Sequence, residues 1–299
     1  MTRPRAPSPD PPSFSLDNPV IKRSPPGAVI YDLSEPDQVT ITLPTGSTWS
    51  SSLHWHEHHI EYLRVVKGSI SVTLNDEKFT LSAESSPAAT SPEIRIDRNS
   101  WHEWRRADAA EPGVNSNDSD RNANSNDDDE NDSANFIKNR ANNDANSGTD
   151  HDEVVVIERT EPADTQKTVF FWNLNGVLLK AQRLSLARPP FIPQFVHAAL
   201  VDLWVTLSLF VIFRDLDNVP VFVNVLQAFA TRGFTFVRGT LGDVLLRHMD
   251  RLISHLVLFV VSRIAWLFGI RAVRAEYTPR DVYTRWAGGA VEGGKAKET

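Results

Sequence analysis

Short runs in which hydrophobic and polar residues alternate fill the first part of the chain, from residue 28 to residue 105. A period of two is typical of strands that bury one face. Turn residues separate the runs, and Asn75-Asp76 predicts a tight hairpin between two of them. Many short strands with regular turns predict an all-β sandwich or barrel. The predicted strands are 28–33, 39–43, 60–66, 69–74, 78–81, 93–96, 101–105 and 153–158.

The spacing of apolar residues becomes helical after 169–172. Residues 176–187 predict a first helix, which the prolines at 189 and 190 end. Two longer apolar runs follow over 195–213 and 241–273, and both approach the length of a transmembrane helix.

Asp202 and Arg263 interrupt these two runs, and a charge near the centre of a bilayer is costly. Arginines flank both runs, as in a lipid headgroup zone, but also as on many soluble helices. Two interpretations stay open. The helical hairpin packs on the sheets or on a second subunit, or it lies on or spans a membrane.

Three segments hold too few apolar residues to form a core, and we predict that they are disordered. They are a proline-rich tail over 1–27, an Asn/Asp-rich insertion over 113–150 and a polar tail over 287–299. Because predicted strands flank the insertion, the simplest picture is a β-hairpin with a lengthened tip, which costs little stability. The chain thus divides into a β domain over 28–172, interrupted by the insertion, and a helical hydrophobic extension over 173–286.

The amino-acid composition argues against several kinds of site and function. The chain has no cysteine, which excludes disulfides, thiolate metal sites and cysteine nucleophiles. A net charge of −7 argues against a nucleic-acid surface. The N-terminal segment has no apolar run of the kind that a secretory signal needs. We therefore expect an intracellular protein, cytoplasmic or membrane-associated and not secreted.

The strongest candidate site is a set of three histidines and one glutamate. His54 and His56 are two residues apart and share one face of a strand. Glu61 follows at the start of the next strand, and His102 comes from a later one. Imidazole and carboxylate ligands bind Fe(II), Mn, Zn, Ni or Cu, and four of them leave one or two positions open for water, dioxygen or substrate. Gly68 permits a tight turn with positive φ.

Neighbouring residues fit the site less well. A shifted pair of His56 and His58 spoils the spacing to Glu61, so His58 and His59 are interpreted as loop residues or as residues behind the ligands. Glu103 points to the face opposite His102 and is interpreted as solvent-exposed or paired within the sheet. The nearby aromatic residues are interpreted as side chains that fill the core, with the lining of a pocket as the alternative. These aromatic residues are Trp55, Tyr62, Phe79, Trp101 and Trp104.

The pattern His54-x-His56-x4-Glu61-x6-Gly68 resembles the first motif of the cupin superfamily. The stretch from Ile96 to His102 resembles the second motif, in which family members usually carry a Pro-x-Gly-x-x-His turn. Asp97 replaces the usual Pro, and Asn99, which tolerates left-handed backbone, replaces the usual Gly. Within the superfamily the chain looks similar to the small fungal cupin-domain oxygenases encoded with polyketide biosynthetic genes.

The resemblance implies a mainly β fold, a cupin-type (RmlC-like) β-barrel with an α-helical C-terminal extension. It also implies a metal-dependent oxygenase that acts on an aromatic or polyketide-like small molecule in secondary metabolism, and a homodimer. His54, His56, Glu61 and His102 would be its metal-binding and catalytic residues. The expected metal is Fe(II), with Mn, Zn or Ni as alternatives. An isomerase or cyclase with a redox-inactive metal, and a non-catalytic small-molecule-binding protein, remain alternatives.

Overall fold

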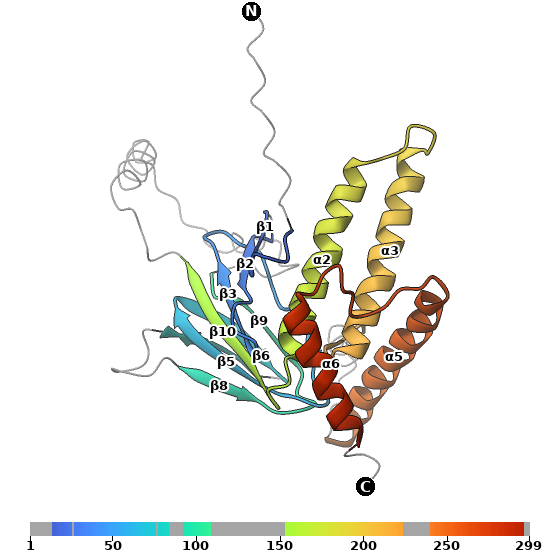
Figure 1. The fold of residues 1–299 in the computed structure, drawn as a ribbon. Coiled ribbons are helices and arrows are strands. Elements are labelled where there is room, and N and C mark those ends of the chain that lie inside the picture. The colour runs from blue at the N-terminus through green and yellow to red at the C-terminus, as the bar shows by residue number, and fades with distance from the viewer. Residues whose placement is uncertain are drawn as a thin grey trace, which may run out of the picture.

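The computed structural model describes residues 14–25, 27–75, 77–83, 92–108, 153–223 and 240–295 of the 299-residue chain. Within this part, two antiparallel sheets face each other, and four helices gather on one side of them (Figure 1).

The larger sheet has six strands in the order β1-β2-β3-β10-β5-β8. Its central strand β10 pairs with β3 on one edge and with β5 on the other. The strands are β1 (Val20–Arg23), β2 (Val29–Asp32), β3 (Gln38–Leu43), β10 (Val154–Glu161), β5 (Ile60–Lys67) and β8 (Glu93–Ile96).

The smaller sheet has five strands in the order β11-β4-β9-β6-β7. Its edge strand β11 belongs to the helical part of the chain and pairs with β4, where Pro220 lies opposite His54. The extension therefore completes the sheet that carries two of the candidate ligands. The strands are β11 (Val219–Pro220), β4 (His54–Trp55), β9 (His102–Arg106), β6 (Ser69–Leu74) and β7 (Glu77–Ser82).

The main core lies between the inner faces of the two sheets. Alternate residues of β3, such as Ile41 and Leu43, are fully buried, and β6 contributes Ile70 and Val72 from the opposite side. Full burial of such a side chain stabilises the fold by about 1.5–3 kcal/mol. The alternation that predicted the strands is thus the pattern of inward and outward residues.

Helices α2 (Gln166–Leu186) and α3 (Gln194–Asp215) pack side by side, and α5 (Thr240–Leu267) packs against α3 (Figure 1). Helix α6 (Arg280–Lys295) contacts α2. Gly176 of α2 lies so close to Tyr277 that a Cβ atom there would be 2.4 Å from the ring. This contact explains a glycine in the middle of a long helix.

The predicted strands are all present, with ends shifted by at most three residues. The tight hairpin is also confirmed, because Leu74 pairs with Glu77 and Asn75 has a φ of 55°. The apolar run over 195–213 lies within α3, and the run over 241–273 forms α5 as far as Leu267. Of the described helices, only α3 has the length and hydropathy of a membrane span, with a mean hydropathy of 2.0 and 28% of that stretch buried in the fold. Membrane association and homodimerisation stay predictions.

The predicted hairpin across the insertion is wrong. Strands β9 and β10 lie in different sheets, and β10 takes a central place between β3 and β5. Alternation identifies a strand but does not say which strand lies beside it, because neighbours are chosen by the packing of whole sheets. The insertion itself, 113–150, lies outside the described residues.

The predicted domain boundaries also need correction. The tail over 1–27 contains β1, whose Ile21 is buried, and Phe14 packs edge-on against Trp172. Helix α2 begins at Gln166, within the predicted β domain, because a short apolar run such as 169–172 fits a buried strand or a helix equally well.

The structure also differs from the prediction of a disordered tail at the C-terminal end. Helix α6 continues to Lys295, although its glycines have low helix propensity and favoured a tail over 287–299. The expectation of a mainly β fold is not met either. The four described helices, of 16 to 28 residues each, contain more of the chain than the strands, none of which exceeds eight residues.

Candidate metal centre

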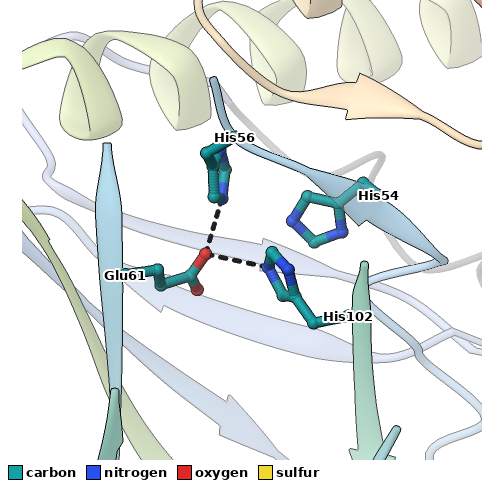
Figure 2. Close-up of side chains that lie close together, drawn as sticks. All are labelled: His54, His56, Glu61 and His102. Carbon is teal, nitrogen blue, oxygen red and sulfur yellow. Dashed lines mark hydrogen bonds and ion pairs between the residues drawn. The ribbon is translucent and has the colours of Figure 1, made fainter. Parts of the chain in front are cut away.

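The four predicted ligands lie together between the two sheets (Figure 2). His54 lies on β4 directly opposite His102 on β9, His56 follows β4, and Glu61 faces them from β5 of the other sheet. Their ligand atoms lie within 4.8 Å of one another, and none of the four residues is more than 7% exposed. The fold therefore brings all four residues to one point.

Backbone carbonyl groups orient the three imidazole rings. In each ring Nδ1 lies next to a carbonyl oxygen, and because a carbonyl only accepts, Nδ1 must carry the hydrogen. The other ring nitrogen, Nε2, is then left with a lone pair in the neutral imidazole, as metal ligation requires. The acceptors are Ser52 for His54 at 2.7 Å, Ser100 for His102 at 3.0 Å and Asp217 for His56.

Glu61 supplies the carboxylate of the cluster. Its Oε2 lies 2.6 Å from Nε2 of His56 and 3.1 Å from Nε2 of His102, as the dashed lines of Figure 2 show. Burial favours the neutral acid, but the charge of Lys167 and the two adjacent histidines hold the pKa of Glu61 well below its usual value. The carboxyl group is therefore ionised at neutral pH.

This donor set fits a divalent metal ion. Burial, together with the neighbouring His102 and His56, lowers the pKa of His54 well below its usual value, so its imidazole is neutral. In the neutral form that metal ligation requires, rings with Nδ1–H fixed on carbonyls would point Nε2 lone pairs at the carboxylate of Glu61, which is repulsive. A cation between them makes every contact attractive, and three nitrogens with one oxygen are ligands that first-row divalent metals accept.

A buried ion-pair chain extends from the cluster. Lys167 of α2 lies 3.1 Å from Oε1 of Glu61 and 2.9 Å from Oε2 of Glu158 on β10. Trp104 donates its Nε1–H to the second oxygen of Glu158 at 2.7 Å. Burial opposes the ammonium charge, but Glu158 and Glu61 raise the pKa of Lys167 above its usual value.

The sequence analysis did not identify Lys167 or Glu158, although the sequence pattern around each residue marks it as a charged residue among buried positions. Glu158 alternates with Val154 and Val156 on the inner face of its strand, where a charge needs a partner. Lys167 likewise precedes the apolar positions Phe170 and Phe171 on a buried helical segment. A charged residue among positions that are otherwise buried and apolar often indicates a functional site.

Asp217, directly after α3, holds the loop that follows the ligand His56. Its carboxylate accepts the backbone N–H groups of Glu57, His58 and His59 at 2.8, 2.9 and 3.1 Å. The same residue offers its carbonyl oxygen to His56. With a φ of 51°, Asp217 has left-handed backbone, which Asp tolerates better than most residues.

The interpretation of His58 and His59 as residues outside the ligand set agrees with this geometry. The His58 side chain is exposed, whereas His59 is buried with its imidazole 2.6 Å from Asp217 and 3.0 Å from Asp164. Burial lowers the pKa of His59, but the two carboxylates outweigh it and raise the pKa to about 9. His59 is therefore an imidazolium at neutral pH.

A cavity of about 440 Å³ opens beside His54 and His56. The polar part of its lining includes Lys167 and His59. Most of its apolar lining comes from β2, the loop before β4, and helices α2 and α3, namely Tyr31, Trp49, Phe170, Phe171, Leu174 and Phe213.

None of the aromatic residues singled out in the sequence lines this cavity. Trp104 belongs to the main core, which agrees with the core interpretation. Trp55 and Trp101 are nearly parallel, with ring centroids 6.1 Å apart, and pack with Leu258 of α5 in a second cluster. Because Trp55 follows His54 on β4, its side chain points to the opposite face.

Three smaller expectations are met. Gly68 has a φ of 74°, and Asn99 has a φ of 63°, so Asn99 takes the left-handed conformation expected of it. Glu103 points away from the cluster and accepts a hydrogen bond from the Ser50 hydroxyl at 2.6 Å.

No protein-family model matches the chain, and no curated protein is detectably related to it. Among solved structures it is similar to KdgF from Halomonas sp., with 15% identity and a TM-score of 0.26 over 51% of this chain and 96% of that one. It is similar to the cupin domain of Cnp3 from Schizosaccharomyces pombe, with 10% identity and a TM-score of 0.22 over 50% and 66% of the two chains.

A putative sugar phosphate isomerase from Acidithiobacillus ferrooxidans is also similar, with 10% identity and a TM-score of 0.24 over 46% of this chain and 62% of that one. The geometry of this chain shows two facing antiparallel sheets around a buried group of three histidines and one glutamate that could hold a divalent metal.

Proposed function

We propose that this chain is a cupin-type metalloenzyme, an oxygenase that acts on an aromatic or polyketide-like small molecule. One observation carries the proposal. Three imidazoles with fixed Nδ1–H groups and one ionised carboxylate converge at the edge of a cavity with aromatic walls. A ligand set and a substrate-sized space in contact are what such an enzyme requires.

We propose Fe(II) as the metal, because an oxygenase needs a redox-active ion, and Mn, Zn and Ni remain alternatives because nitrogen and oxygen ligands accept them all. The metal, when bound, would supply Lewis acidity and redox chemistry. His54, His56, His102 and Glu61 would hold it, with one or two positions left for other ligands.

The chain's own residues would bind and orient the substrate. Rings such as Phe170, Phe171 and Trp49 offer apolar surface that excludes water and stacks against a planar molecule. Lys167 and His59 add two fixed positive charges to the same lining.

Metal content of protein purified without chelator tests the proposal. We expect about one divalent metal ion per chain and its loss in His54→Ala, because three ligands hold a metal far less tightly than four. His58→Ala is the matched control, since His58 lies in the same segment with an exposed side chain. Equal metal content in wild type and His54→Ala would count against the site, and oxygen consumption in the presence of substrate then tests the reaction.

An isomerase or cyclase is the second candidate, because the charges of Lys167 and His59 could stabilise a substrate charge without electron transfer. Turnover that needs no dioxygen and persists with Zn favours this alternative. Binding of small molecules without turnover would instead indicate a non-catalytic binding protein.

A further inference from the structure

We propose that the tip of the α2–α3 hairpin, residues 183–202, docks on the surface of a membrane that contains anionic lipids and inserts its apolar side chains below the headgroups. None of these residues belongs to the candidate metal centre or lines the cavity beside it. The inference therefore goes beyond the proposed function and does not depend on it.

The hairpin tip exposes large apolar side chains. It lies at the end of α2 and α3 that points away from the two sheets (Figure 1). Leu186, Phe191 and Phe195 are 76%, 82% and 76% exposed there. A single exposed apolar residue is ordinary on a protein surface, but several of them at one protruding end indicate an interaction surface.

A groove next to the tip extends this apolar surface. Leu200 and Leu203 of α3 line the groove together with Phe268, which follows the end of α5. Phe268 and the neighbouring Trp266 are also largely exposed. Aromatic and leucine side chains of this kind are typical of the face that a protein turns toward lipid at the membrane interface.

The charges of the hairpin tip match an anionic surface. The sequence over 165–201 contains no acidic residue, whereas Arg183 and Arg188 are both exposed on the tip. The charged residues that line the adjacent groove are Arg271, Arg274 and Glu276. Basic side chains close to a membrane are attracted to anionic lipids such as phosphatidylserine. Two copies of the chain that met at this tip would instead bring like charges together, which favours a membrane over a second copy.

The loop at the tip has few backbone groups that would lose a hydrogen bond in lipid. Pro189, Pro190 and Pro193 have no N–H group. Ile192 donates its N–H to the carbonyl oxygen of Pro189 at 3.1 Å. Arg188 donates from its guanidinium to the carbonyl oxygen of Ile192 at 2.6 Å, and a guanidinium has further N–H groups with which to bind a lipid phosphate. The loop is therefore suited to the boundary between headgroups and acyl chains.

The rest of α3 limits the depth of insertion. Asp202 is exposed, and it lies about 12 Å along the helix from Gln194. Further along, Ile212 is buried in the main core, and Asp217, directly after α3, binds the loop that follows His56. A membrane span over the whole of α3 would remove these residues from the fold. The tip therefore enters one leaflet only, to the depth of about 5–10 Å that is typical of interfacial helices.

Sedimentation of the full-length protein with lipid vesicles tests the proposal. One set of vesicles contains phosphatidylcholine and phosphatidylserine in equal parts, and the other contains phosphatidylcholine alone. We expect binding to the mixed vesicles to be tighter by about tenfold or more, since each basic residue near the surface contributes. High salt should weaken this binding, because it screens the charges.

Variants of the tip separate the apolar contribution from the charge. Phe191→Ala should weaken binding to the mixed vesicles about tenfold and leave the melting temperature unchanged, because the ring is exposed in the free protein. Tyr283→Ala is the matched control, since it removes an exposed ring from α6 and should leave binding unchanged. Arg183→Gln should weaken binding to the mixed vesicles about fivefold and leave binding to phosphatidylcholine alone unchanged.

Wild type that binds neither set of vesicles contradicts the proposal, as does equal binding by wild type and Phe191→Ala. Equal affinity for the two sets of vesicles contradicts the preference for anionic lipid. Protein that stays with the vesicles after a wash in alkaline carbonate would contain a transmembrane helix and not an inserted tip. Dimerisation that Phe191→Ala abolishes, measured by light scattering and without vesicle binding, would assign the surface to a second copy.

Discussion

The four candidate ligands come from the two sheets, whereas many of the groups that hold them and enclose the cavity come from the helical part of the chain, which begins with α2 at Gln166. His54, Glu61 and His102 lie on β4, β5 and β9. Asp217, which fixes the loop after His56, and Lys167, which pairs with Glu61, belong to the segment from α2 to β11. The helical part of the chain therefore contributes to the candidate site, and the sheets alone do not build it.

The ligands and the groups that hold them also differ in how far apart they lie along the chain. Three of the ligands lie within eight residues of one another, from His54 to Glu61. Asp217 is more than 150 residues away from the loop that its carboxylate binds. Local spacing can reveal the first group, but only the folded chain reveals the second.

Replacing Asp217 gives the largest effect of a residue outside the ligand set. Asp217→Asn keeps a residue that tolerates left-handed backbone but leaves one oxygen to serve three N–H groups and His59. We expect metal affinity to fall about tenfold to a hundredfold, as for other groups that orient metal ligands. Competition with a chromophoric chelator measures the affinity.

Asp215→Asn is the matched control for this change, since Asp215 lies two residues earlier with an exposed side chain. It should leave metal affinity unchanged. Unaltered affinity in Asp217→Asn would mean that the sheets alone hold the ligands, and the comparison between the two regions would fail.

A change within the helices alone should lower stability without affecting the metal. Gly176→Ala puts a Cβ atom within 2.4 Å of Tyr277, and overpacking of this kind costs about 1–3 kcal/mol. In a protein of this size each kcal/mol lowers the melting temperature by about 2–4 °C. Thermal unfolding measures the shift, and metal stoichiometry on the same sample should equal that of wild type.

Gly288→Ala makes the same substitution in α6, where no other group lies within 4 Å. It should stabilise the helix by about 0.5–1 kcal/mol, because alanine loses less backbone entropy than glycine. If both variants raise the melting temperature, the contact between Gly176 and Tyr277 is not as close as the geometry indicates.

The smallest effect is expected at Asn99, in the second motif. Asn99→Gly restores the glycine usual in the resembling family and fits the φ of 63°. The two hydrogen bonds at this position, from its N–H to His56 and from Arg251 to its carbonyl oxygen, use backbone atoms of Asn99. We expect stability within about 0.5 kcal/mol of wild type, measured by urea unfolding, and full metal content. Loss of metal would show that the Asn99 side chain itself is needed.

The strands and the ligand set could be predicted because both are local. Alternation reports which residues of β3 or β6 face the core, and the spacing of His54, His56 and Glu61 places them on adjoining strands. Lys167 could not be placed, since nothing near it in the chain indicates that Glu61 and Glu158 lie beside it. The aromatic cavity walls were missed for the same reason, because Tyr31, Trp49 and Phe170 come from three separate segments.

By itself, then, the sequence determined the presence of short strands, the helical character of the two apolar runs and the identity of the four candidate ligands. The strands, the helices and three of the ligands follow from spacing within short segments, and His102 follows from the resemblance of its own stretch to a second motif. The tertiary structure decided that β10 lies between β3 and β5, that β1 and β11 complete the sheets, and that Asp217 and Lys167 reach the site. These depend on packing between distant segments, where burial and charge pairing select partners that no local pattern specifies.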